Sequence, residues 1–129
     1  MNESDRIKFT VYLPGRIIDK LKIQAAQTGL MTYSGITEGI ITRVFTELGD
    51  MKDFAELMRT PKYQNILTDF IPVKRGRPPL TRKIVIKQKI TFYVSHQFFK
   101  LVKRYQRRFN LSSSSLVEMS LLIHYKCGF

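Results

Sequence analysis

The sequence is short of the residues that cross-link chains, bind metals or carry out catalysis. It has one cysteine and two histidines in 129 residues. Cys127 can therefore form no internal disulfide, and no cysteine or histidine cluster surrounds it to hold zinc. No nucleophile and base are paired by their spacing, and no glycine-rich phosphate loop follows a predicted strand. We expect a protein that is not an enzyme and that has no metal and no cofactor.

Long apolar runs are also missing. No run approaches the roughly 20 residues that cross a bilayer as a helix. The first residues, MNESDRIKF, lack the apolar core of a secretory signal. We therefore expect a cytoplasmic protein with no membrane partner. A chain of this length forms one compact unit, or two very small units that share a core.

Acidic residues are scarce in one part of the chain only. Residues 1–70 hold 9 Lys or Arg and 9 Asp or Glu, whereas residues 71–129 hold 13 Lys or Arg and the single carboxylate Glu118. The whole formal charge of +12 therefore comes from the second part. Such an excess favours a polyanionic partner, nucleic acid first and an anionic membrane surface second.

What the sequence does contain is a repeat. The stretch KFTVYLP at residues 8–14 returns 81 residues later as KITFYVS at residues 89–95. In a strand, alternate side chains point to opposite faces, so Lys, Thr and Tyr share one face in both copies and apolar residues share the other. The apolar set differs between the copies, as two strands that fill one core would allow. Water places no demand on residue identity, so the copied triplet predicts a surface for a partner.

Two helical patterns follow each predicted strand. The first pattern ends at Gly29, where a left-handed cap would end a helix, and Asn110 takes that place in the second copy. The next helix has Thr32 and Ser34 as candidate N-caps, and its counterpart begins within LSSSS at residues 111–115. Ile36, Glu38 and Ile41 correspond to Leu116, Glu118 and Leu121, at an offset of 80 residues.

The segment between the copies divides into two parts. Residues 49–73 predict a spacer of two short helices, the first capped by Asp50 and the second opened by Thr60 with Pro61. Residues 74–86 form a basic, proline-containing linker, and its RGRP resembles an AT-hook, which places arginines in a narrow minor groove. Non-specific phosphate contact by Arg75 and Arg77 is the alternative.

The order of strand, helix, capped turn and helix, present twice, resembles the ribbon-helix-helix family of DNA-binding proteins, the Arc and methionine-repressor type. The resemblance covers roughly residues 6–48 and 87–126. It implies an α+β, mostly helical fold in which two units, residues 1–48 and 87–129, pair through a two-stranded antiparallel ribbon over a four-helix core. The fusion of two copies departs from the usual single copy per chain and is similar to regulators encoded by viruses of archaea.

The resemblance also implies where DNA would bind, because the family inserts its ribbon in the major groove and reads bases with the polar strand face. The base-contacting residues would be Lys8, Thr10, Tyr12, Lys89, Thr91 and Tyr93. A solvated sheet face is the alternative for these six. The phosphate-contacting residues, at the strand starts and the N-termini of the second helices, would be Arg6, Thr32, Tyr33, Ser34, Lys87, Ser112, Ser113 and Ser114. Plain N-capping explains the serines and Thr32 without DNA.

The predicted helix that follows the second strand carries five further basic residues: Lys100, Lys103, Arg104, Arg107 and Arg108. They form either a solvated helix face or, in part, a contact to the DNA backbone.

We therefore expect a sequence-specific, double-stranded DNA-binding transcription regulator, repressor or activator, that occupies a partly palindromic operator in the cytoplasm, or in the host cytoplasm if it is viral. A DNA-coating or packaging protein, an antitoxin-like module with a protein partner at residues 49–73, and a membrane-surface protein remain as rivals. The repeats are expected to pair within one chain, with Thr10 near Thr91, Lys8 near Tyr93 and Tyr12 near Lys89. The sequence leaves open whether several copies of the protein assemble on DNA.

Overall fold

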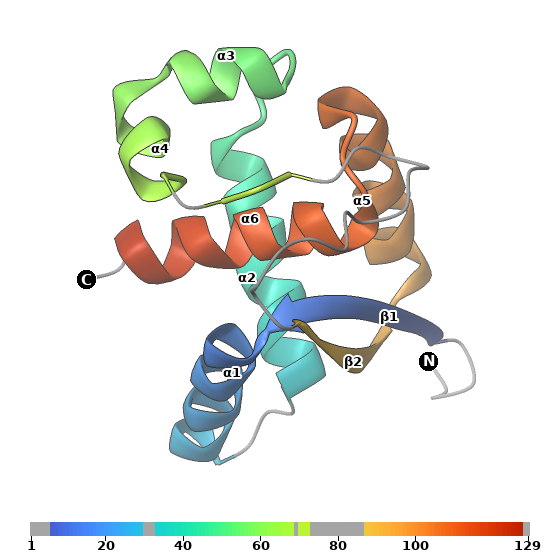
Figure 1. Ribbon diagram of the computed structural model, residues 1–129. Helices are drawn as coiled ribbons and strands as arrows, with labels where there is room; N and C mark the ends of the chain where they lie inside the picture. Colours follow the sequence, from blue (N-terminus) through green and yellow to red (C-terminus); the bar gives the residue numbers. More distant parts are fainter. Residues whose placement is uncertain (1–5, 30–32, 69, 73–86, 128–129) are drawn as a thin grey trace.

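The computed structural model describes residues 6–29, 33–68, 70–72 and 87–127. These residues form an α+β fold that is mostly helical, with one two-stranded antiparallel sheet and six helices (Figure 1). The strands are β1 (Ile7–Pro14) and β2 (Lys87–Val94). Within the described ranges, no helix combines the length and the apolar character that crossing a bilayer requires.

Each strand leads directly into a pair of helices. β1 is followed by α1 (Gly15–Thr28) and α2 (Tyr33–Glu47), and β2 by α5 (His96–Phe109) and α6 (Ser113–Cys127). Two short helices lie between the repeats, α3 (Phe54–Arg59) and α4 (Pro61–Ile66). The predicted repeat of strand, helix and helix is therefore present.

The two strands pair with each other in the predicted register. Thr10 lies opposite Thr91, Lys8 opposite Tyr93 and Tyr12 opposite Lys89. The apolar faces of both strands are buried, because each strand alternates a core-facing with an outward-facing side chain. The ribbon is thus built within one chain, with its polar side chains on the face opposite the core.

The helix ends agree with the predicted left-handed caps. Gly29 has φ 68° and ends α1, and Asn110 has φ 54° and ends α5. The main-chain N–H of each donates to a carbonyl of the preceding turn. Glycine lacks the Cβ that disfavours this conformation, and asparagine tolerates it better than most residues.

Two predicted N-caps are wrong. Asp53, and not Asp50, caps α3: its Oδ1 accepts the N–H of Glu56 at 2.8 Å, and Glu56 accepts the N–H of Lys52 in return. This reciprocal arrangement satisfies two N–H groups at once, which explains why the helix starts there. Ser34 is the second residue of α2, so it does not cap that helix.

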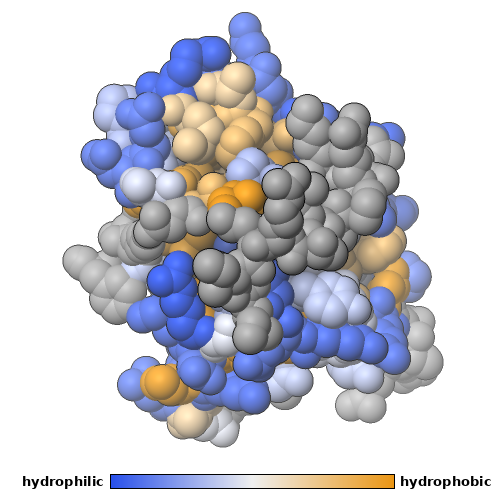
Figure 2. Space-filling model, viewed as in Figure 1, coloured by the Kyte–Doolittle hydropathy of each residue, from blue (hydrophilic) through white to orange (hydrophobic). Residues whose placement is uncertain are grey.

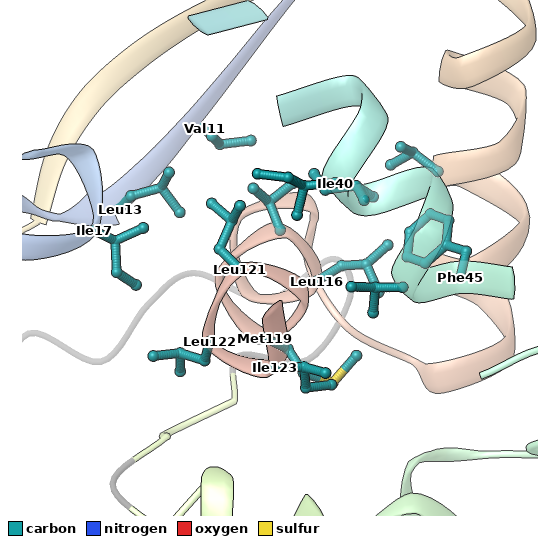
Figure 3. Close-up of a cluster of buried hydrophobic side chains, with 14 of the residues drawn as sticks. Val11, Leu13, Ile17, Ile40, Phe45, Leu116, Met119, Leu121, Leu122 and Ile123 are labelled. Atoms are coloured by element: carbon teal, nitrogen blue, oxygen red, sulfur yellow. The ribbon is translucent and has the colours of Figure 1, made fainter. Parts of the chain in front are cut away.

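The core lies between the ribbon and the crossed pair α2 and α6. These two helices pack against each other, α2 also packs on β2, and α6 also packs on β1. Each repeat therefore covers the strand of the other repeat. Val11, Leu13 and Leu121 are fully buried in this layer (Figure 3). Phe92 of β2 and Ile41 of α2 are fully buried as well.

The spacer packs on the side of α6 that faces away from the ribbon. α4 packs on α6, and the spacer adds Leu57, Tyr63 and Leu67 to the core. Figure 3 shows Leu121 of α6 toward the ribbon and Met119 on the opposite side of the same helix, toward the spacer. In the view of Figure 2, apolar side chains gather in the upper part, where Figure 1 draws α3 and α4, and hydrophilic ones dominate the lower part, around the ribbon and α1.

Candidate nucleic-acid interface

The ribbon presents six outward side chains in a nearly two-fold arrangement. This polar face consists of Lys8, Thr10, Tyr12, Lys89, Thr91 and Tyr93. At its centre the hydroxyl oxygens of Thr10 and Thr91 are 3.1 Å apart, joined by a hydrogen bond. Tyr12 is 51% exposed and Tyr93 53%, although both are large aromatic side chains. The strands therefore place two identical triplets on one open surface, related by an axis through the threonine pair.

On the outer edge of each strand, one main-chain N–H donates a hydrogen bond to a serine hydroxyl. The N–H of Tyr12 donates to Oγ of Ser114 at 2.9 Å, and the N–H of Tyr93 donates to Oγ of Ser34 at 3.2 Å. Each serine sits in the first turn of the second helix of the other repeat. A hydroxyl that accepts one hydrogen bond still has its own O–H to donate. Ser34 and Ser114, which are both predicted to contact phosphate, therefore lie beside the polar face, and each has a hydroxyl hydrogen that it can donate.

The other residues expected at these helix starts have contacts inside the protein. Oγ of Ser112 accepts the N–H of Ser115 at 3.2 Å, so Ser112 caps α6. Ser113 donates its hydroxyl to Oε1 of Gln106 at 3.2 Å. Tyr33 packs edge-on against Phe92, with ring centroids 5.8 Å apart. Thr32 lies outside the described residues, as do Arg75 and Arg77 of the linker.

The two cations at the strand starts have different partners. Arg6 donates from Nη1 to the main-chain oxygen of Tyr93 at 3.0 Å. Nζ of Lys87 lies 3.0 Å from Oε1 of Glu118, whose side chain is 9% exposed. Lys87 is therefore neutralised by a carboxylate, whereas the contact of Arg6 is to a neutral oxygen.

Two carboxylates at this interface were missed as site residues. Glu38 accepts the N–H of Ser95 at 3.0 Å, and Glu118 binds Lys87. The sequence did contain a signal: both glutamates occupy the same position in the repeats, and Glu118 is the only carboxylate of its half. A carboxylate kept in an otherwise basic unit indicates a specific partner.

The basic side of α5 is partly structural. Arg108 donates to the main-chain oxygen of Gly49 at 3.1 Å and lies over the ring of Tyr105 at 4.7 Å. Lys103 lies 5.1 Å from the ring centre of Phe99. The group as a whole remains exposed apart from Arg108: Lys100, Lys103, Arg104 and Arg107. It extends positive charge along α5, beyond the end of β2.

Within the described part of the chain, no group of three His, Cys, Asp or Glu side chains could hold a metal ion. His124 is partly buried, and this burial, aided by the charge of Arg43, lowers its pKa below the usual value. It lies at the far end of α6 from Ser114 and takes no part in the polar face.

Comparisons with models of protein families, with curated proteins and with solved structures give no match to this chain.

Proposed function

We propose that the protein is a sequence-specific regulator of transcription that inserts its ribbon into the major groove of a partly palindromic DNA operator, as a tandem ribbon-helix-helix protein. One observation carries the proposal: the two copied triplets form a single exposed face, with Thr10 opposite Thr91. The core explains the buried strand residues, and the hydrogen bond between Thr10 and Thr91 explains the two threonines. Among the described residues, no side-chain contact explains why the exposed lysines and tyrosines are identical as well.

The two-stranded form and the symmetry of the ribbon support this function. The major groove of B-DNA admits a two-stranded ribbon. An axis through the threonine pair relates Lys8 and Tyr12 of β1 to Lys89 and Tyr93 of β2. A palindromic duplex has an axis of the same kind, so each triplet would meet the same bases in its own half-site.

The side chains on the polar face have the chemistry for base recognition. Lysine donates to the guanine acceptors O6 and N7. Threonine can bond to either kind of base edge or pack its methyl group on that of thymine. The exposed tyrosines add a hydroxyl on a rigid arm. Together the six residues offer both donors and acceptors, as sequence recognition requires.

The surroundings of the polar face suit the DNA backbone. Ser34 and Ser114 lie in the first turns of α2 and α6, next to Tyr93 and Tyr12. The N-terminus of a helix is the positive end of its dipole, which favours phosphate. The charge of +12 adds long-range attraction and makes binding dependent on salt.

Selection of bound sequences from a pool of random duplexes tests the function. We expect enrichment of a partial palindrome. A non-specific coating protein would share the charge but would enrich no sequence. A membrane-surface protein would bind anionic vesicles equally well after its threonine pair was replaced.

The threonine pair gives a sharper test. In the variant Thr10→Ala/Thr91→Ala, the preference for the selected site over random DNA should fall, by about 1 to 3 kcal/mol for each base that the hydroxyls no longer reach, while weak binding at low salt remains. The matched control is Thr42→Ala/Thr46→Ala, which removes two hydroxyls from the exposed side of α2. Competition binding measures the ratio. An unchanged ratio in the ribbon variant would show that the polar face does not read bases.

A further inference from the structure

The two ends of the ribbon are built from equivalent residues of the two repeats, but they differ at the residue that precedes the first helix. Pro14 ends β1 and precedes α1, and Ser95 follows β2 and precedes α5. Their backbones are nearly the same, with φ −57° and ψ 142° at Pro14 and φ −72° and ψ 158° at Ser95. The two residues therefore hold equivalent places, and their difference is chemical: proline has no N–H and no hydroxyl.

At the Ser95 end, the nearby carboxylate is engaged by the main chain. Oε1 of Glu38 accepts the N–H of Ser95 at 3.0 Å and its hydroxyl at 3.3 Å. Oγ of Ser95 in turn accepts the N–H of Phe98 and caps α5. Arg6, the cation at this end of the ribbon, donates to the carbonyl of Tyr93. Its positive charge is not compensated by Glu38.

At the Pro14 end, the equivalent carboxylate takes a cation instead. Glu118 of the second repeat occupies the position equivalent to Glu38 of the first repeat. Pro14, however, has no N–H and no hydroxyl that could donate a hydrogen bond to Glu118. Its Oε1 lies 3.0 Å from Nζ of Lys87, the residue that pairs with Pro14 in the ribbon. Because Glu118 is nearly buried, removal of this cation would leave a desolvated charge unpaired, which is strongly unfavourable. Lys87 is therefore held by the protein.

We propose that Pro14 makes the two ends of the ribbon unequal, so that Arg6 contacts a DNA phosphate while Lys87 stays bound to Glu118. The inference rests on the proposed function. Both half-sites would meet the same three base-reading residues, but only the half-site beside Arg6 would have the additional phosphate contact. Pro14 is then a positioning residue, because it acts on DNA through Glu118 and Lys87.

Exchange of the two residues tests this inference. In Pro14→Ser, the new N–H and hydroxyl should draw Glu118 away, as Ser95 does with Glu38, and release Lys87 to a phosphate. The slope of log affinity against log salt should then steepen by about 0.9. In Ser95→Pro, Glu38 should be freed to pair with Arg6, and the slope should flatten by about 0.9.

Two further variants serve as controls: the double exchange at both ends of the ribbon and a substitution of a proline far from it. Pro14→Ser/Ser95→Pro should restore the parent's slope with the two ends interchanged. Pro61→Ser makes the same chemical change at the start of α4, away from the ribbon, and should leave the slope unchanged. A folded Pro14→Ser protein with the parent's slope would overturn the inference, whether or not Ser95→Pro folds.

A measurement without DNA separates this inference from the proposed function. The reaction of lysine amines with an acylating reagent, followed by mass spectrometry, reports how free each Nζ is. Lys87 should react more slowly than Lys89 in the parent protein and should approach the rate of Lys89 in Pro14→Ser. If the parent binds no DNA, the proposed function fails while this comparison still stands. Equal rates of Lys87 in both proteins would show that Pro14 does not control its pairing.

Discussion

At the scale of single residues, backbone conformation decides where the helices end. Gly29 and Asn110 adopt the left-handed conformation at equivalent places in the two repeats. A Cβ at Gly29 would meet no atom within 4 Å, so any cost of a substitution there comes from the backbone and not from a clash.

We expect Gly29→Ala to lower the free energy of unfolding by about 1 to 2 kcal/mol, because an alanine is strained in this conformation. Gly29→Asn should cost clearly less, because asparagine already serves at position 110. Urea unfolding of both variants measures the difference. An alanine variant as stable as the asparagine variant would contradict a left-handed residue at this position.

These caps were predictable because they depend on residue type and on local spacing. The start of α3 was predictable too, since Asp53 and Glu56 have the spacing of a reciprocal cap, although we predicted Asp50 in their place. The partner of Glu118 was not predictable in this way. It depends on Pro14 having no N–H and on a strand pairing that brings Lys87 beside it, and both matter only once the chain is folded.

At the scale of elements, the two central helices are equivalent in the repeat but differ in their surroundings. α2 keeps an exposed side, where a Cβ added at Gly39 would meet no atom within 4 Å. Its counterpart in α6 is Met119, which is fully buried. Residues 115–123 of α6 are buried on every side of the helix, and which elements cover them could not be predicted from local sequence patterns. On the side of α6 that carries Met119, the spacer covers the helix, and α4 makes its contacts with α6 between residues that are distant in the sequence.

This difference predicts opposite effects of alanine at the two equivalent positions. Met119→Ala should destabilise the protein by about 2 to 5 kcal/mol, since it leaves a cavity between α6 and the spacer. Gly39→Ala should instead stabilise it by about 0.5 to 1 kcal/mol, because alanine restricts the unfolded chain and fits an exposed helix. Thermal or urea unfolding measures both. Destabilisation at both positions would mean that α2 is covered as α6 is.

At the scale of the whole molecule, the pairing of the strands within one chain leads to a prediction of the oligomeric state. The ribbon uses one edge of each strand for the other strand, and Ser34 and Ser114 occupy N–H groups on the two outer edges. Exposed strand edges would otherwise invite pairing between molecules.

We therefore expect a monomer of 15.1 kDa in free solution. Sedimentation at micromolar concentration should show this species, with no change on dilution. An obligate dimer without detectable monomer would contradict the internal pair, because it would mean that strands from different chains form the ribbon. The register of the ribbon was predictable from the copied strands, since only one pairing brings the identical triplets into opposition.

The distance in sequence between the paired strands bears on the order of events at the ribosome. Thr10 must wait for Thr91, 81 residues later, before the ribbon can close. At about 5 to 20 residues per second, this delay is roughly 4 to 16 s. During that interval the apolar side of β1, with Phe9, Val11 and Leu13, has no strand partner. The nascent chain is thus exposed to chaperones and to aggregation until the second copy emerges.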